Sequence, residues 1–155
     1  MTRIKKNRPA RIEHVPEINS RAGLLNFIDK HGTDSRTIFK FGTGSTTAGY
    51  IYYLKSDETW DLADATTNLS GSDRVVALAL GSSPATSGML LRGTTTTIAG
   101  ILSPSSGKAL YLSTTPGRLT TIAPTGSAEV VRIGGHCLNS TRIYFNPEPG
   151  WLELV

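Results

Sequence analysis

The stretch from Gly107 to Leu154 reads GKALYLSTTPGRLTTIAPTGSAEVVRIGGHCLNSTRIYFNPEPGWLEL, and its pattern indicates the fold class. Short apolar runs are separated by Thr-Pro-Gly, Pro-Thr-Gly, Asn-Ser and Pro-Glu-Pro-Gly, which are typical of tight turns. This alternation predicts a meander of antiparallel strands. No group of side chains in the stretch has the make-up of a reactive site. The pattern therefore indicates a structural role rather than a chemical one.

The same pattern extends back to residue 37, with turn clusters such as Gly81-Ser82-Ser83-Pro84 between the apolar runs. Strands and helices do not alternate, so a parallel α/β sheet is not expected. The sequence predicts a mainly β protein, a small antiparallel β-barrel or sandwich with an extended N-terminal arm and one short helix. The expected strands are Thr37–Phe41, Gly49–Leu54, Arg74–Leu80, Met89–Thr97, Ala109–Ser113, Arg118–Ile122, Glu129–Cys137, Arg142–Phe145 and Trp151–Leu154.

Composition limits the classes of function. The 155 residues fit one domain, or one domain plus an arm. The one cysteine, Cys137, excludes a disulfide within the chain, a four-cysteine zinc site and a CxxC redox pair. The start MTRIKKNRPAR has no apolar core of a signal peptide, and no run of about 18 apolar residues occurs, so neither secretion nor a membrane span is expected.

Positive charge is concentrated at the N-terminus. Residues 1–40 hold nine Lys and Arg against four Asp and Glu, whereas residues 41–155 hold seven against eight. We expect residues 1–48 to form a basic arm with a short helix near residues 20–31, where Ser20 is the N-cap and Gly32 the C-cap. Residues 49–155 are expected to form the β domain.

The arm has two interpretations of equal weight, an electrostatic tether and a solvated terminus. As a tether it suits an acidic protein surface better than nucleic acid, because no aromatic residue that stacks on bases lies among its cations. The residues expected to contact a partner comprise five cations and four apolar anchors: Arg3, Ile4, Lys5, Lys6, Arg8, Arg11, Ile12, Val15 and Ile18.

Groups that might carry chemistry are better explained as structural. The Gly-rich loop Phe41–Gly49 lacks the lysine of a phosphate-binding loop. His14, His31 and His136 have no metal-ligand spacing, and the side chains of His136 and Cys137 should point to opposite faces of a strand. The acids Asp57, Glu58, Asp61 and Asp64 are expected in a solvated turn, with Trp60 as a core or edge aromatic. We therefore expect no enzymatic activity, no cofactor and no metal.

Two strands are apolar without interruption, Val75–Leu80 and Ala109–Leu112. A strand of this kind needs cover on both faces. Either another subunit supplies the second cover, or the small alanines tolerate exposure.

The order of the hairpins resembles a β-rich module of tailed-bacteriophage structural proteins, over about residues 49–154. It is similar to capsid decoration (cement) proteins and to terminal modules of tail fibres. The segments that carry the resemblance are Tyr50–Leu54, Trp60–Ala65, Val76–Gly81, Gly88–Gly93, Ala109–Ser113, Gly117–Thr120, Val130–Gly134 and Ile143–Pro147.

The resemblance implies a small β-barrel or tulip-like domain that commonly assembles as trimers and has no enzymatic activity. The leading hypothesis is a decoration protein made in the host cytoplasm and bound to the major capsid protein on the surface of the virion. An alternative is a tail-fibre or adsorption module that contacts the host surface. A third hypothesis, association with DNA through the arm, is less favoured. The absence of any repeat disfavours a fibre shaft.

Overall fold

Every regular element that the computed structural model describes is a β-strand, and the residues it describes are 36–66 and 74–155. The prediction of a mainly β protein is therefore confirmed. The expected helix near residues 20–31 and the arm residues 1–35 lie outside the described residues. Arg36–Val155 form one compact unit. Residues 36–48 belong to this unit, so it begins before position 49.

The strands are short and follow one another closely along the chain. They are β1 (Thr37–Phe39), β2 (Ile51–Leu54), β3 (Trp60–Leu62), β4 (Val76–Ala79), β5 (Met89–Thr95), β6 (Ile101–Leu102), β7 (Ala109–Leu112), β8 (Leu119–Thr120), β9 (Val130–Val131), β10 (Ile133–Asn139), β11 (Arg142–Phe145) and β12 (Leu152–Glu153).

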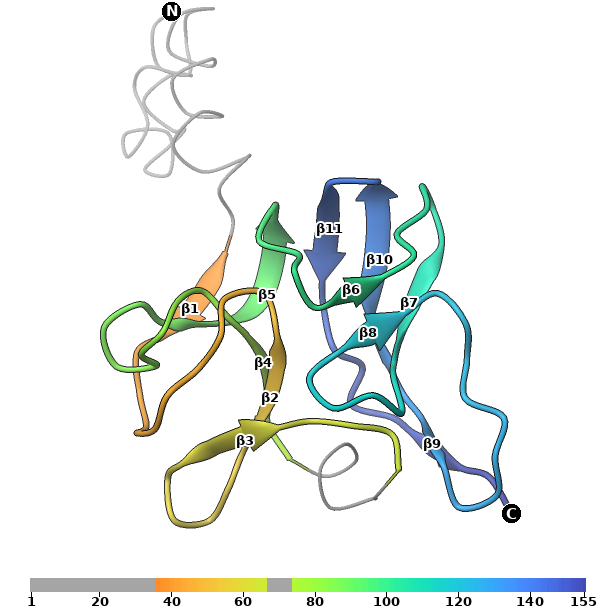
Figure 1. Cartoon of the computed structure of the whole chain (residues 1–155), viewed down its shortest axis with the longest axis horizontal. Helices are drawn as coiled ribbons and strands as arrows, with labels where there is room; N and C mark the ends of the chain where they lie inside the picture. The colour runs from red at the N-terminus through yellow and green to blue at the C-terminus, as the bar shows by residue number, and fades with distance from the viewer. Residues whose placement is uncertain (1–35, 67–73) are drawn as a thin grey trace, which may run out of the picture. The chain divides into compact units, whose positions relative to one another are not determined.

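One curled sheet contains ten of these strands (Figure 1). Its order is β3-β2-β4-β5-β11-β10-β7-β8-β6, and β1 also pairs with β5. All of its pairs are antiparallel except β6 with β8, which is parallel. That pair departs from the all-antiparallel expectation. Strands β9 and β12 form a separate two-stranded ribbon.

The curled sheet surrounds an inner core. Alternate residues of β7 and β11 point into it: Leu110, Leu112, Ile143 and Phe145 are all buried. Together with these, the buried members of the inner core are Ile51, Ala63, Ala65, Val76, Leu78, Leu90, Ile101, Leu119 and Cys137. Burial of these apolar side chains is the main source of the unit's stability.

A smaller outer core lies on the other face of β2, β4 and β5, and consists of Tyr52, Trp60, Ala77, Ala79 and Met89. The segment 41–48 is fastened to it, because Trp60 Nε1 donates to the Phe41 carbonyl at 2.8 Å and the Thr47 N–H donates to the Tyr52 hydroxyl at 2.8 Å. All four residues of β4 are buried, two against each core. Both faces of this apolar strand are thus covered by the chain itself, without another subunit.

Loop backbone, rather than a strand pair, joins the two ends of the sheet. The Ile51 N–H donates to the Gly117 carbonyl at 2.9 Å, and the Gly117 N–H donates to the Ala63 carbonyl at 2.7 Å. Nearby, the Gly100 N–H donates to the Gly49 carbonyl at 2.9 Å. A methyl group at Gly100 would overlap that carbonyl oxygen, so this close approach requires glycine. We call these contacts the seam.

Most predicted strands lie where they were expected, but their ends were predicted less accurately than their positions. The bounds Arg142–Phe145 are confirmed as predicted. Strands β3 and β6, of three and two residues, were not predicted. The single strand expected at Glu129–Cys137 is instead two strands, interrupted at Arg132. That arginine is buried, and its side chain donates to the Glu148 carbonyl at 2.7 Å.

Candidate functional site

The nine arm residues expected to contact a partner, Arg3, Ile4, Lys5, Lys6, Arg8, Arg11, Ile12, Val15 and Ile18, lie outside the described residues, as do His14 and His31. The described unit begins at Arg36, and β1 starts at the next residue. This strand is therefore the first strand of the β unit and directly follows the basic segment along the chain.

Strand β1 is exposed along its whole length. Ile38 and Phe39 are each 39% exposed, which is unusual for large apolar side chains in a strand. The Phe39 ring stacks on that of Phe41 with 5.1 Å between centroids, so part of the apolar surface is ordered. The cations Arg36 and Lys40 flank the strand. β1 thus presents an apolar strip with positive charge at both ends.

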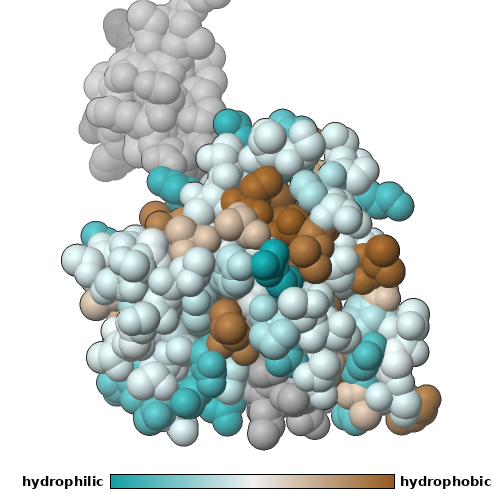
Figure 2. Space-filling view, viewed as in Figure 1, coloured by the Kyte–Doolittle hydropathy of each residue, from teal (hydrophilic) through white to brown (hydrophobic). Residues whose placement is uncertain are grey.

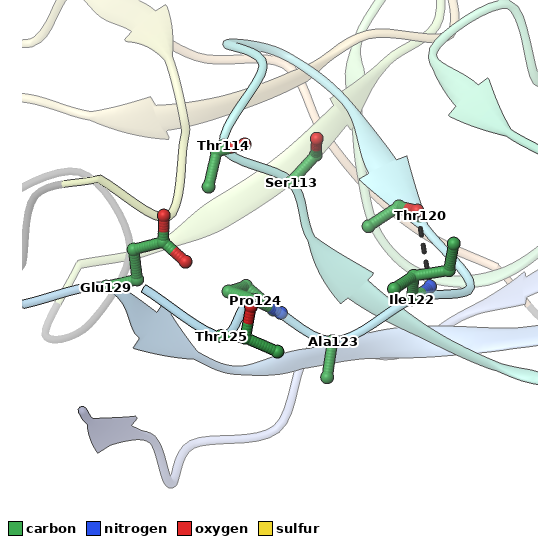
Figure 3. Close-up of a pocket in the computed structure, with 8 residues that line it drawn as sticks. All are labelled: Ser113, Thr114, Thr120, Ile122, Ala123, Pro124, Thr125 and Glu129. Carbon is green, nitrogen blue, oxygen red and sulfur yellow. Dashed lines mark hydrogen bonds between the residues drawn. The ribbon is translucent and has the colours of Figure 1, made fainter. Parts of the chain in front are cut away.

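A polar hollow opens between β7, β8 and the loop that leads to β9 (Figure 3). Its volume is about 290 Å³. Hydroxyl groups from the turn after β7, from β8 and from the loop line it with the Glu129 carboxylate, beside three apolar residues of the loop. The full lining is Ser113, Thr114, Thr120, Ile122, Ala123, Pro124, Thr125 and Glu129.

Hydrogen bonds within the chain hold several of the polar groups in this hollow. The Ser113 Oγ accepts the Thr115 N–H at 3.0 Å, and the Glu129 carboxylate accepts the Gly126 N–H at 2.7 Å. Among the described residues that line the hollow there is no cationic side chain, so this lining suits a neutral polyol better than an anion. Its described lining includes no aromatic side chain, and Glu129 is its one ionisable group. The hollow thus presents hydroxyl groups and one carboxylate to a small polar ligand.

The Gly-rich loop Phe41–Gly49 is a structural element. Its Thr43 N–H donates to the Glu58 carbonyl at 3.0 Å, and its Thr46 hydroxyl donates to the Gly81 carbonyl at 2.7 Å. The loop therefore covers the outer core. This supports the structural interpretation, although the loop packs more closely than a simple turn before a strand.

His136 and Cys137 lie on opposite faces of β10, as predicted. His136 is exposed and Cys137 is buried in the inner core. The two side chains therefore cannot act together as a base and a nucleophile.

Two acids of the β2–β3 region accept hydrogen bonds from threonines two residues further along the chain. Asp57 accepts both the N–H and the hydroxyl of Thr59, and Asp64 accepts the same two groups of Thr66. The side-chain hydrogen bond from Thr59 is the largest cause of a lowered pKa at Asp57. The expectation that all four acids sit in a turn was wrong for Asp61, which lies in β3. Trp60 is a buried core aromatic, as predicted.

Arg132 is a buried cation that sequence reasoning overlooked. Besides the Glu148 carbonyl, its guanidinium reaches the Arg74 carbonyl at 3.3 Å, and burial lowers its pKa from the ordinary value. The alternation of side chains along a strand could have indicated this burial. Arg132 lies two residues from each of Val130 and Gly134, which are buried, and so falls on the same face. Its contacts join segments far apart in the sequence, which makes it a structural clamp.

Apolar side chains also reach the molecular surface. In Figure 2 they gather over β6 and the neighbouring strand ends. Leu102 of β6 and Ile98 are half-buried, and Ile98 packs against the inner core.

Among residues 36–66 and 74–155, no cluster of three or more His, Cys, Asp or Glu side chains is placed to hold a metal ion. The same residues include no helix with the length and hydropathy that a membrane crossing requires. Neither a scan against protein-family models nor a search of the curated proteins found a match to the chain.

Proposed function

We propose that this chain is a non-enzymatic structural protein of a bacteriophage virion, a decoration protein that binds the major capsid protein as trimers. The observation that carries the proposal is a division between two parts of the chain. The β unit covers its most apolar strand from both sides with its own residues, while the concentrated positive charge lies in residues 1–40. A self-contained β unit linked to a charged segment suits a protein that attaches by one end.

The mechanism we propose is mechanical. Residues 1–48 contact neighbouring capsid subunits, with apolar anchors and cations sharing the contact along a strip. Ordering a segment on binding costs conformational entropy, so a long strip with many contacts is needed to offset it. Many copies on one particle then add stability across the joints between subunits.

Binding to purified expanded capsids of the cognate phage tests the arm. We expect a chain that lacks residues 1–19 to lose most of its cosedimentation with capsids. In the full chain, Lys5→Gln with Lys6→Gln should weaken binding more than Lys108→Gln with Arg142→Gln, which removes the same charge from the β unit. Equal binding by the truncated and full chains would show that the arm does not tether the protein.

Copy number tests the location. Quantitative gel densitometry of virions should give hundreds of copies per particle, and a dozen or fewer would contradict decoration. Binding of DNA through the arm would instead weaken steeply as salt rises, because each phosphate contact releases counterions.

A second candidate, a tail-fibre or adsorption module, is favoured by the hydroxyl-lined hollow beside Glu129. Neutral polyols of a host surface glycan suit its lining. Binding of the full chain to a host-glycan array, with Glu129→Gln as the variant, tests this candidate. Low copy number together with glycan binding that this substitution weakens would favour it over decoration.

A further inference from the structure

The Glu129 carboxylate is the main hydrogen-bond acceptor of the hollow beside β8. It accepts the Gly126 N–H at 2.7 Å. A carboxylate has roughly four acceptor positions on its two oxygen atoms, so this bond uses one of them. Figure 3 shows Glu129 on one side of the hollow and Thr120 on the other. The further acceptor positions of the carboxylate can therefore receive hydrogen bonds from a ligand.

Two hydroxyl groups of the lining supply donors. The Ser113 Oγ accepts the Thr115 N–H at 3.0 Å, and the Thr120 Oγ1 accepts the Ile122 N–H at 3.2 Å. A hydroxyl that accepts an N–H in this way keeps its own hydrogen for another acceptor. The backbone N–H groups hold the two oxygen atoms in place. Both hydroxyl groups can thus donate to oxygen atoms of a ligand in the hollow.

An apolar segment completes the lining. It consists of Ile122, Ala123 and Pro124, and Ile122 is 72% exposed. Contact with carbon-bound hydrogens of a ligand would remove part of this apolar surface from water, which is favourable. The volume of about 290 Å³ is close to the lower limit of ligand pockets, roughly 300 Å³. The hollow therefore suits a molecule of the size of one sugar ring.

The carboxylate discriminates among such molecules by their charge. A neutral hydroxyl donates an ordinary hydrogen bond to it, whereas an ammonium group donates a charge-assisted bond, which is shorter and stronger. The hydroxyl groups of Ser113 and Thr120 require oxygen acceptors, and a simple alkylammonium ion has none. A ligand that uses all three side chains therefore carries both an ammonium group and hydroxyl groups.

We propose that the hollow binds an amino sugar with a free amine. Its ammonium group contacts the Glu129 carboxylate, and its hydroxyl oxygens accept from Ser113 and Thr120. A neutral sugar makes the hydroxyl contacts without the ionic one, so it binds more weakly. This inference deepens the second candidate function and rests on it, because both place a glycan in the hollow, and it does not depend on decoration.

The probes are D-glucosamine and D-glucose, which differ by an amine in place of one hydroxyl. Each is titrated into the full ¹⁵N-labelled chain at about pH 6, where an amine of pKa about 8 is protonated. We expect the largest amide shifts at Thr115, Ile122 and Gly126, because their N–H groups donate to the three side chains that contact the sugar. D-glucosamine should bind about fivefold more tightly than D-glucose.

Two variants and two further ligands separate charge from shape. Glu129→Gln keeps an acceptor for the Gly126 N–H and should reduce the preference for D-glucosamine to less than twofold. Glu58→Gln, which neutralises an exposed carboxylate in the turn before β3, should leave the fivefold preference unchanged. N-acetyl-D-glucosamine, which lacks the positive charge, and n-propylamine, which lacks hydroxyl groups, should each bind at least fivefold more weakly than D-glucosamine.

Equal affinity for D-glucosamine and D-glucose would overturn the inference and leave the second candidate standing, because a glycan would still bind. The inference is also overturned if the preference survives Glu129→Gln, or if n-propylamine binds as tightly as D-glucosamine. Shifts confined to residues outside 113–129, or no shifts at tens of millimolar sugar, overturn it as well. The glycan array and the capsid assay then decide the two candidate functions separately.

Discussion

Strands β1 and β4 lie on either side of the same two residues of β5, yet their surroundings are opposite. β4 pairs with Leu90 and Met89 through Leu78 and Ala79, and all four of its residues are buried. β1 pairs with the same two residues through Ile38 and Phe39, and it is exposed throughout.

Local sequence preference does not explain this difference. The Thr-Ile-Phe of β1 has a higher strand propensity than the Val-Ala-Leu-Ala of β4. The difference comes from other segments, because the sheet curls so that the inner core covers one face of β4 and the outer core covers the other. Position in the sheet, rather than composition, separates a structural strand from one available for contact.

The largest expected effect comes from removing a side chain in β4. Leu78→Ala should lower the free energy of unfolding by about 3 kcal/mol, since a buried leucine loses its contacts and leaves a cavity. Ile38→Ala, the matching change in β1, should cost less than about 1 kcal/mol. Chemical denaturation of the full chain measures both, and equal losses would refute the contrast between the strands.

The second-largest loss of stability should come from a substitution at the seam. Gly100→Ala places a methyl group against the Gly49 carbonyl, and fixed backbone cannot yield as a flexible side chain can. We expect a loss of about 2–3 kcal/mol in unfolding free energy from this overpacking. Gly150→Ala is the matched control, because no atom lies within 4 Å of its Cβ position. Similar stability of the two variants would show that the seam does not hold the curled sheet closed.

Trp60→Phe tests how the outer core is held in place. The substitution keeps an aromatic ring but removes the hydrogen bond to the Phe41 carbonyl. A loss of about 1–2 kcal/mol is expected from the unpaired carbonyl and the smaller ring. Hydrogen exchange should show faster opening of residues 41–48 than of the inner core. Uniform acceleration across the unit would mean that the two cores open together.

The smallest effect concerns Asp57, in the exposed turn that leads into β3. The pKa of Asp57 is lowered in the folded state, so its ionised carboxylate stabilises the fold. This contribution to stability is fully present above the ordinary carboxyl pKa of about 4, and it is lost as the pH falls through the folded-state pKa. Asp57→Asn should melt slightly below the parent at pH 7, and the two melting temperatures should converge in acid, once the pH has fallen below the folded-state pKa of Asp57. Asn139 makes the same turn with Thr141, so the amide can replace the acid in geometry. A difference that persists in acid would exclude ionisation as its cause.

Much of the fold was predictable because turns and apolar runs are local signals. Asn139 and the Pro and Gly residues mark turns that delimit strands, and Arg142–Phe145 was placed correctly for that reason. The two-residue strand β6 was not predicted from these signals. Its pairing with β8 depends on the seam, where glycines from three distant segments meet. Contacts between distant segments leave no periodic trace in the sequence.

The candidate surfaces were less predictable. The opposite faces of His136 and Cys137 follow from strand geometry alone. The hollow around Ser113 and Glu129 does not, because its lining comes from the turn after β7, from β8 and from the loop before β9, whose arrangement depends on the curl of the sheet. The exposure of β1 was also unpredictable, since an apolar strand is expected to be covered.

The amino-acid sequence by itself determined the β class, the turns and the uneven distribution of charge, because each depends on residues close together in the chain. Only the tertiary structure decided that β4 is covered on both faces by its own chain while the three residues of β1 are exposed. The physical reason is that burial depends on which distant segments cover a strand. The basic segment thus joins the β unit through the strand whose neighbours leave it exposed.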